Sequence, residues 1–315
     1  MILTVTLNPA IDKILILDEF VLHKLHRLEK GEMSLVVPGG KGVNIAHNLK
    51  KLGNTVATTG FAGGHSGHLL CERLRIEGIS TSFVFTNGVT RTNTSILDRK
   101  NETLTEINDF GQEISAEDVS FFIETYDRLL HRIRIVVIAG SLPKGVDPTI
   151  LTELIQLASK KGKQVIVHTL SDYTEECMKA SPYLIVPDMR SRHELFGKKI
   201  DGIAQFLEAG RHILMHSPHT QVVCFIHRIE NVVAVTRDKS YILRPKDLKI
   251  VNMLGYGDAY VAGFIHAQDK GLPLKTILRY ASAAGLTDVE DLYKEIRDIH
   301  LIDKNIKRID LEEVE

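Results

Sequence analysis

The segment Gly255-Tyr256-Gly257-Asp258 combines two features that chemistry at a hydroxyl group needs. An apolar helical pattern through Val261, Phe264 and Ile265 follows it, so these glycines stand at the start of a predicted helix. Backbone N–H groups at such a start form an anion hole, and a carboxylate beside the hole can take a proton from an attacking hydroxyl. Phosphoryl transfer to an alcohol requires this pairing. Alternatively, Asp258 only stabilises the helix N-terminus through the helix dipole.

A second segment, Pro38-Gly39-Gly40-Lys41-Gly42-Val43-Asn44, also leads into a predicted helix. Its glycines let the backbone approach a ligand closely, the helix start offers unpaired N–H groups, and Lys41 adds a full positive charge. Together these features suit a phosphate group. The spacing Gly-x-x-x-x-Gly-Lys-Ser/Thr of a P-loop is absent, so that kind of nucleotide site is excluded. Alternatively, a glycine-rich segment before a helix is only a turn.

Further polar residues follow predicted strands. Asp12 comes just beyond the first strand, and Ser141 ends another. Carboxyl ends of strands in open α/β sheets face the ligand crevice, so we expect Asp12 to accept hydrogen bonds from ligand hydroxyls and Ser141 to donate to a phosphate. Either residue could instead cap a turn. Arg91, Asn93 and Arg27 would supply positive charge and donors to an anionic ligand, or else form a solvated strand face.

These segments need a sheet that gathers strand ends at one edge. Apolar, β-branched runs bounded by turn residues predict strands at 2–7, 55–62, 135–139, 164–167, 183–186 and 221–226. Helical patterns separate most of them, with predicted starts at Gly42, Ser66, Ser115, Pro148, Asp201, Gly257 and Leu274. The alternation predicts an α/β fold with a doubly wound, mostly parallel sheet and helices on both faces.

Two stretches, at about 13–37 and 81–108, break this alternation. In the second, three strand-like runs follow one another with no helical pattern between them. We expect a small β-strand lid, contributed by both stretches and inserted into one α/β domain that spans residues 1–315. Such a lid could close over a crevice or pair with its copy in a homodimer. The segment from Thr287 onward mixes charged residues with Leu, Ile and Val, which predicts surface helices.

The composition excludes several classes of protein. The chain is 43% apolar and 25% charged, with a net charge of -1, as in ordinary globular proteins. Balanced charge and short apolar runs predict no nucleic-acid partner and no membrane span. The three cysteines and 14 histidines show no disulfide or metal-ligand spacing, so no protein metal site is predicted. The N-terminus has no signal-peptide pattern, and we expect a cytoplasmic protein.

The order of the motifs resembles the ribokinase-like (PfkB) carbohydrate kinases, and within them the 1-phosphofructokinase and tagatose-6-phosphate kinase branch. The specific parts are Thr-Leu-Asn-Pro-Ala-Ile-Asp at 6–12, Pro-Gly-Gly-Lys-Gly-Val-Asn at 38–44 and Val-Asn-x-x-Gly-x-Gly-Asp-x-x-Val-Ala-Gly-Phe at 251–264. The resemblance runs from residue 1 to about 285. Lys41 looks like the mark of a branch that acts on sugar phosphates.

This resemblance implies transfer of the γ-phosphoryl group of ATP, with Mg²⁺, to a sugar-phosphate hydroxyl. Asp258 would be the general base, with the N–H groups of Gly255, Tyr256 and Gly257 stabilising the transferring phosphoryl. The remaining roles implied for the substrate are as follows: Asp12, Gly39, Gly40 and Asn44 would hold the sugar, Lys41, Arg91 and Ser141 its phosphate, with Asn93 and Arg27 as further contacts. The family also implies a β lid, often paired between two subunits.

The sequence departs from the family on the nucleotide side. Where relatives have Lys-Pro-Asn-x-x-Glu, this chain has Val186-Pro187-Asp188-Met189-Arg190-Ser191, so Asp188 and the later Glu194 are the candidates for the nucleotide side. The family's Ser-Leu-Gly-x-x-Gly is replaced by a segment from Cys224 to Ile229 that has neither glycine. Where the family has Asp-Thr-Ser-Gly, the corresponding segment of this chain begins with His168.

Two alternatives therefore stay open beside the kinase. One is a non-catalytic sensor or regulatory protein that binds a phosphosugar without a working nucleotide site. The other is a nucleoside or vitamin kinase with an uncharged acceptor, which Lys41 and Arg91 oppose. The sequence does not separate fructose 1-phosphate from tagatose 6-phosphate, because only the geometry of the pocket distinguishes these sugars.

Overall fold

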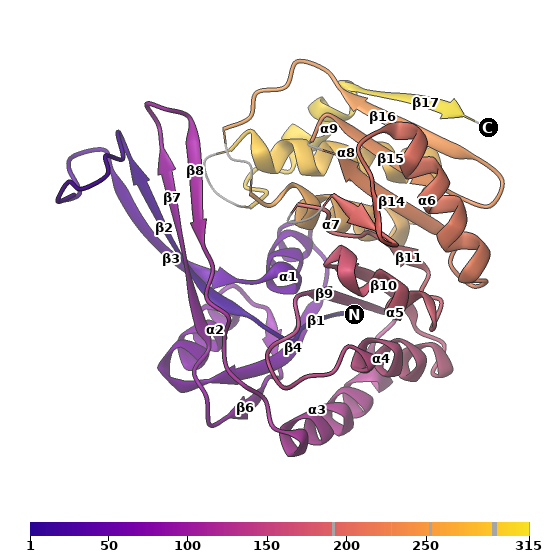
Figure 1. Cartoon of the computed structure of the whole chain (residues 1–315), viewed down its shortest axis with the longest axis horizontal. Coiled ribbons are helices and arrows are strands. Elements are labelled where there is room, and N and C mark those ends of the chain that lie inside the picture. The colour runs from indigo at the N-terminus through magenta and orange to yellow at the C-terminus, as the bar shows by residue number, and fades with distance from the viewer. Residues whose placement is uncertain (191–192, 228, 252–253, 292–294, 315) are drawn as a thin grey trace.

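A central sheet runs through the molecule and carries helices on both sides (Figure 1). The computed structural model describes residues 1–190, 193–227, 229–251, 254–291 and 295–314. Within these ranges the central sheet has eleven strands in the order β17-β16-β15-β14-β11-β10-β9-β1-β4-β5, with β6 also paired to β4. The strands are β1 (Ile2–Thr6), β4 (Val56–Gly63), β5 (Ser80–Thr81), β6 (Val84–Thr86), β9 (Ile135–Gly140), β10 (Gln164–Thr169), β11 (Leu184–Ile185), β14 (Val222–His227), β15 (Asn231–Val235), β16 (Ser240–Pro245) and β17 (Ile309–Val314).

The middle of this sheet is parallel and one edge is antiparallel. The pairs from β5 through β4, β1, β9, β10 and β11 to β14 are all parallel. Strands β14 to β17 pair antiparallel with one another. The parallel strands are buried on both faces, which explains their unbroken Val and Ile runs.

Alternate residues of the strands bury against two layers of helices. Ile135 and Val137 of β9 face the layer of α1, α2, α7, α8 and α9, whereas Val136 and Ile138 face α3 and α4. Helix α6 covers the continuation of that second face beside β14 and β15. The helices are α1 (Lys41–Lys51), α2 (Gly64–Ile76), α3 (Ala116–Leu129), α4 (Thr149–Lys160), α5 (Thr174–Met178), α6 (Ile203–His216), α7 (Tyr256–Asp269), α8 (Leu274–Val289) and α9 (His300–Ile306). The predicted doubly wound, mostly parallel α/β fold is confirmed.

Helix starts follow the local sequence signals closely. Ser115 caps α3, because its Oγ accepts a hydrogen bond from the backbone N–H of Asp118 at 3.1 Å. Helix α8 begins at Leu274, the residue predicted from the pattern. The other predicted starts lie within two residues of the observed ones.

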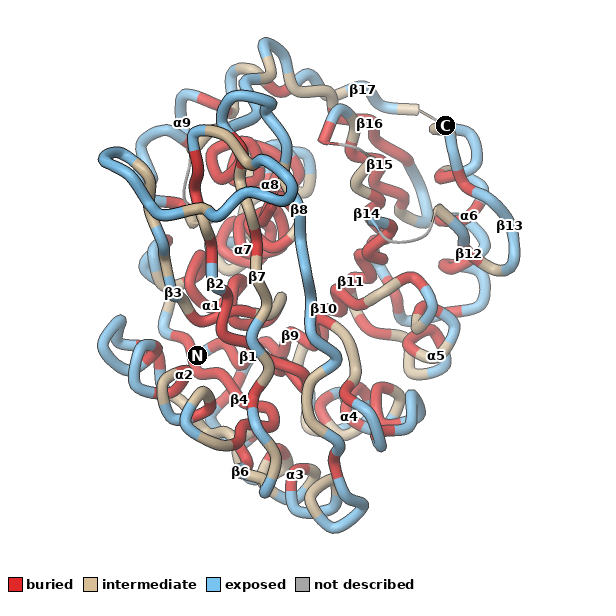
Figure 2. The backbone as a smooth tube through the Cα atoms, turned by 60° about the vertical axis from the view of Figure 1, so that its left-hand side comes forward, coloured by how far each residue is buried: buried red, intermediate tan, exposed pale blue. Residues whose placement is uncertain are grey.

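A second sheet of four strands stands apart from the central one (Figure 1). Its order is β3-β2-β7-β8, and we call it the small sheet. Its strands are β2 (Ala10–Leu17), β3 (Met33–Gly39), β7 (Arg91–Asp98) and β8 (Thr103–Ile107). Strand β8 is largely exposed along its length, in contrast to the buried strands of the central sheet (Figure 2). A two-stranded hairpin of β12 (Glu194–Leu195) and β13 (Lys198–Lys199) lies elsewhere.

Two sequence expectations are wrong in detail. The run at 82–86 does not join the small sheet, because β6 pairs in parallel with β4 of the central sheet. The segment after Thr287 is not only helical, since β17 closes the edge of the central sheet against β16. In β17 only Ile309 is fully buried. The mixture of charged and apolar residues in this segment is therefore as typical of a surface helix as of an edge strand.

The described residues include no helix long and apolar enough to cross a membrane. All three cysteines are buried as free thiols.

Candidate active site

Two helix N-termini meet at the carboxyl ends of the central strands. Gly40 precedes α1 with φ of 101°, and Gly255 precedes α7 with φ of 95°. Both values lie in the region that glycine adopts without strain, and at Gly40 a Cβ would also come within 3.0 Å of Thr6. The chain can therefore enter both helices at a sharp angle and point their first N–H groups toward one space.

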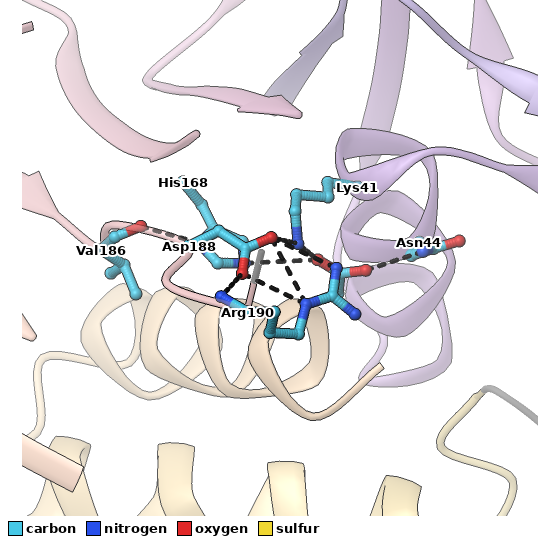
Figure 3. Close-up of polar contacts among 7 residues, drawn as sticks. Lys41, Asn44, His168, Val186, Asp188 and Arg190 are labelled. Carbon is cyan, nitrogen blue, oxygen red and sulfur yellow. Dashed lines mark hydrogen bonds and ion pairs between the residues drawn. The ribbon is translucent and has the colours of Figure 1, made fainter. Parts of the chain in front are cut away.

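Asp258 lies in the first turn of α7 and is 4% exposed. One carboxylate oxygen, Oδ2, accepts a hydrogen bond of 2.7 Å from Nδ2 of Asn44 on α1 (Figure 3). The other, Oδ1, is 3.4 Å from Nε2 of His168 and 3.8 Å from Nζ of Lys41. The carboxylate is thus fixed between two helices, beside the backbone N–H groups at the start of α7.

Tyr256 is the first residue of α7 and stands between Gly255 and Gly257. Its side chain is buried, and burial raises the pKa of its phenol. Gly285 of α8 makes the space: a Cβ there would lie 2.9 Å from the Tyr256 ring. The large side chain therefore points into the helix layer, away from the space in front of α7.

Asp188 joins two cations at the centre of the site. Its Oδ2 is 2.7 Å from Nζ of Lys41, and its Oδ1 and Oδ2 accept bonds of 3.2 Å from Nε and Nη2 of Arg190 (Figure 3). Burial opposes its ionisation, but the positive charges of Lys41 and Arg190 outweigh burial and hold the pKa of Asp188 well below its usual value. The three charged groups form one cluster with a net positive charge.

His168 is the third group next to Asp258. It lies near the end of β10, is 2% exposed, and its Nδ1 is 2.8 Å from the carbonyl oxygen of Val186 (Figure 3). No candidate role was predicted for it, although its replacement of an aspartate in the family pattern was a signal. Arg190 was likewise visible only as a departure from that pattern.

A polar pocket opens between the small sheet and the central sheet. Its empty space, open to solvent, is about 770 Å³. It is lined by Asn8, Asp12, Gly40, Lys41, Asn44, Arg91, Asn93, Ser95, Glu106, Asn108, Gly140, Ser141, Leu170, Asp188, Arg190 and Asp258. Asp12 accepts a bond of 2.9 Å from Nδ2 of Asn93, in keeping with the pairing of these residues across β2 and β7. Gly39 lies beside this pair, and a Cβ there would overlap the Asp12 carboxylate.

Arg91 and Asn8 shape the wall of the polar pocket. Arg91 donates from Nη1 to the Asp109 carbonyl at 2.8 Å and from Nη2 to the Asn8 carbonyl at 2.9 Å. Burial lowers the pKa of Arg91, an effect that nearby Asp12 and Asp109 oppose. Asn8 donates from Nδ2 to Ser141 Oγ at 3.4 Å, which leaves the Ser141 hydroxyl hydrogen for a ligand. Arg91 therefore supplies charge while its terminal donors hold the wall together.

An apolar pocket adjoins the polar one on the other side of Asp258. Its empty space is about 640 Å³, and it is lined by Lys41, His168, Pro187, Asp188, Met189, Arg190, Ile226, Ile229, Gly255, Tyr256, Gly257 and Asp258. Ile226 and Ile229 belong to the tight hairpin of β14 and β15, where His227 pairs with Asn231. Ile229 has φ of 67°, a left-handed conformation that is costly for a β-branched residue.

The structure thus brings together most of the predicted site residues and leaves three outside the lining of the two pockets; one of them is Gly39, which lies against Asp12. Asp258, Lys41 and Asp188 line both pockets. Arg27 is exposed in the loop between β2 and β3, and Glu194 is exposed in β12; neither lines either pocket.

Comparisons with known proteins identify relatives of the whole chain. The family model described as pfkB family carbohydrate kinase matches residues 6–292. The 1-phosphofructokinase of Bacillus subtilis (strain 168) is 29% identical over 285 residues, which cover 90% of this chain and 91% of that protein. A Thermotoga maritima structure described as a possible 1-phosphofructokinase has a TM-score of 0.94 at 32% identity over 100% of both chains. The tetrameric inhibited form of Escherichia coli phosphofructokinase-2 shares the fold, with a TM-score of 0.85 and 22% identity over 97% of this chain and 98% of that one.

Proposed function

The chain belongs to the pfkB family of carbohydrate kinases, and from that premise we propose that it transfers the γ-phosphoryl group of ATP to a hydroxyl of a phosphorylated ketose. The similarity to 1-phosphofructokinases favours fructose 1-phosphate as the acceptor, with tagatose 6-phosphate as the other candidate. The family implies ATP as the donor.

The acceptor is expected in the polar pocket. Lys41, Arg91 and Ser141 line it and offer positive charge and hydroxyl donation for the existing phosphate. Asp12 and Asn93 are paired across β2 and β7 and present acceptor and donor groups to sugar hydroxyls. An uncharged acceptor would make no use of the positive charge of Lys41 and Arg91, which argues against a nucleoside or vitamin.

One observation carries the proposal: Asp258 lines both pockets and stands at the N-terminus of α7. A hydroxyl held in the polar pocket would approach Asp258 from one side, and a phosphoryl group in the apolar pocket would meet the N–H groups of Gly255, Tyr256 and Gly257. Asp258 is then the general base for the hydroxyl proton. Gly40 and Asn44 serve by placing α1 and by holding the Asp258 carboxylate.

Magnesium fits this site only together with the nucleotide. The described residues contain no group of three His, Cys, Asp or Glu side chains that could hold a metal ion. Mg²⁺ keeps several waters and commonly binds through substrate phosphates. We therefore expect it to arrive on the phosphates of ATP, where it supplies charge neutralisation, while the helix N-terminus of α7 binds the transferring group.

The test is release of ADP with Mg·ATP and a panel of sugar phosphates and free sugars. We expect turnover on one phosphorylated ketose, and a kcat about two to four orders of magnitude lower for Asp258→Asn with little change in KM. Asp303→Asn, which removes an exposed aspartate from the first turn of α9, is the matched control and should behave as wild type. Turnover that survives Asp258→Asn would disprove the assignment of the base.

One observation favours a second candidate, a phosphosugar sensor without catalysis. The apolar pocket is walled by Ile226 and Ile229 where a nucleotide phosphate would meet glycine backbone, and Asp188 places a carboxylate there. Calorimetry separates the two functions. A kinase binds both Mg·ATP and the sugar phosphate, whereas the sensor binds the sugar phosphate alone.

We also propose that two copies associate through the small sheet. Apolar side chains are exposed on β3 and β8 at Val36 and Ile107, and on the loop between β2 and β3 at Leu22 and Leu25. Covering them in a homodimer would remove this surface from water. We place the reaction in the cytoplasm, where the three buried thiols would stay reduced.

A further inference from the structure

His168 is a buried titratable group to which the proposed function gives no part. Only 2% of its surface is exposed, and it stands near the carboxyl end of β10, beneath the first turn of α7. The structure admits the ring because residue 257 is glycine: a Cβ there would lie 3.0 Å from Nε2 of His168 and 3.3 Å from Cε1. Gly257 therefore serves the placement of this imidazole as well as the anion hole.

The contacts of His168 fix which ring nitrogen carries the hydrogen. Nδ1 is 2.8 Å from the carbonyl oxygen of Val186, and a carbonyl oxygen only accepts hydrogen bonds (Figure 3). Nδ1 must then be the protonated nitrogen of the neutral ring. The lone pair of that ring is on Nε2, which makes no hydrogen bond with the described residues.

Nε2 faces the carboxylate that the proposed function makes the base. It lies 3.4 Å from Oδ1 of Asp258, while Oδ2 of the same carboxylate is held by Asn44. A lone pair facing an ionised carboxylate is unfavourable, whereas the same lone pair accepts a hydrogen bond once that carboxyl is protonated. The pairing therefore stabilises the protonated state of Asp258, the state that forms when Asp258 takes a proton.

The surrounding charges come from three elements. Lys41 of α1 is 3.8 Å from Asp258 Oδ1, and its positive charge opposes the protonation of His168 to an imidazolium. Asp188, after β11, attracts such a charge, and Arg190 offsets part of that attraction. A proton on Nε2 would lie between two carboxylates and beside two cations that already share Asp188.

We infer that His168 is a positioning residue that receives, through Nε2, the proton that Asp258 takes from the acceptor hydroxyl. This inference rests on the proposed function. The hydroxyl oxygen forms its bond to the γ-phosphorus as the bond from that phosphorus to the ADP oxygen breaks, and ADP keeps the electron pair. The hydroxyl proton bonds to Asp258 and then to Nε2, which leaves an imidazolium and an ionised Asp258. The imidazolium returns the proton to water through Asp258 when product leaves.

Two variants distinguish this proton relay, from the acceptor hydroxyl through Asp258 to His168, from a role of His168 in packing alone. His168→Asn keeps an amide N–H where Nδ1 bonds the Val186 carbonyl, and His168→Gln puts a non-basic amide near the place of Nε2. We expect both to lower kcat about 10-fold to 100-fold, with the KM of the acceptor within about twofold of wild type. The acid limb of the kcat profile should move to lower pH by about one unit, because a lone carboxylate is a weaker base than the pair.

Imidazole ¹⁵N NMR gives a readout that needs no turnover. The resonance absent from His168→Asn identifies residue 168, and we expect the Nδ1–H tautomer in wild type and a shifted titration in Asp258→Asn. The Nε2–H tautomer, an unchanged titration, or variants that keep the wild-type pH profile would each overturn the relay alone. If NMR shows that His168 and Asp258 are coupled but no sugar phosphate is turned over, the proposed function is wrong, and the relay, which depends on it, is wrong as well.

Discussion

At the scale of single residues, Lys41, Asp188 and Arg190 form one charge cluster that lines both pockets. Asp188 is buried and is bound to both cations, so it is the residue through which they are coupled. Removing one partner of a buried ion pair leaves the other charges uncompensated. The resulting loss of stability is larger than the net stabilisation that the intact pair provides.

Asp188→Asn should show this coupling as a pH-dependent loss of stability. We expect the free energy of unfolding to fall by about 2 to 4 kcal/mol at pH 7. The folded-state pKa of Asp188 lies below the unfolded value of 3.8, so its stabilisation is complete above about pH 5 and declines as the pH falls below 3.8. In urea titrations, the difference in unfolding free energy between wild type and Asp188→Asn should therefore decrease by about 1 kcal/mol between pH 5 and pH 3.

The control for this prediction is Asp310→Asn, which breaks an exposed pair with Lys246. Its effect should stay below about 1 kcal/mol at both pH values. A deficit of Asp188→Asn that does not change with pH would contradict the depressed pKa.

Lys41→Ala tests which substrate this lysine serves. Loss of a charge-assisted hydrogen bond should raise the KM for the phosphorylated acceptor about 10-fold to 100-fold, with a smaller effect on kcat. Steady-state kinetics with Lys13→Ala, an exposed lysine of β2, provide the comparison. If kcat falls and the KM stays constant, Lys41 acts on the transferring phosphoryl group instead.

The sequence predicted the residues of the site better than the contacts among them. Asp258 and Asn44 were visible because each follows a glycine-rich helix start, a signal contained in a few neighbouring residues. His168 was not assigned a role, because it reaches Asp258 from the end of β10, a contact between residues far apart in the sequence. Arg190 lies only two residues after Asp188, but it was visible only as a departure from the family pattern.

At the scale of elements, the hairpin of β14 and β15 forms one wall of the apolar pocket. Ile229 is buried there in a left-handed conformation, which costs about 1 to 2 kcal/mol for a residue with a Cβ. Its side chain lies where the proposed function requires a nucleotide phosphate to pass.

Ile229→Gly should therefore improve nucleotide binding. The change removes both the strained backbone and the side chain from the wall, and we expect the Kd for Mg·ATP to fall several-fold in calorimetry. Ile229→Val keeps the β-branch and most of the wall, so its Kd should match wild type. An unchanged or weaker Kd for Ile229→Gly would show that the nucleotide does not use this pocket.

Prediction of the elements from sequence was reliable where the period was clear. The parallel strands and seven helix starts follow from apolar runs and caps. The lid runs were only partly assigned, since β6 pairs with β4 rather than with the small sheet. Strand β17 was missed because the alternation Ile-Asp-Leu-Glu-Glu-Val has one buried position and is stabilised by its pairing with β16.

At the scale of the whole molecule, the small sheet projects from the α/β body, and its outer strand β8 is exposed along most of its length (Figures 1 and 2). Its parallel pairing of β2 with β7 joins residues 10–17 to residues 91–98 and carries Asp12 and Asn93 to the polar pocket. The surface proposed for self-association therefore belongs to the same sheet that forms part of the site.

Leu25→Glu should disrupt that association. Leu25 is 71% exposed in the loop between β2 and β3, and a buried charge at a dimer contact is strongly unfavourable. Sedimentation velocity should show a dimer for wild type and a monomer for the variant. Met215→Glu, at a side chain of 72% exposure on α6, should remain dimeric. A monomeric wild type at micromolar concentration would rule out this interface.

The position of β17 has a consequence for synthesis on the ribosome. Strand β16 acquires its outer neighbour only after residues 309–314 have been translated and have left the exit tunnel. Until then the nascent chain presents an open row of backbone donors and acceptors along β16, a template for pairing with other chains. Chaperones should therefore be needed at this edge until β17 has emerged, and a ribosome that stalls between β16 and β17 would release an aggregation-prone chain.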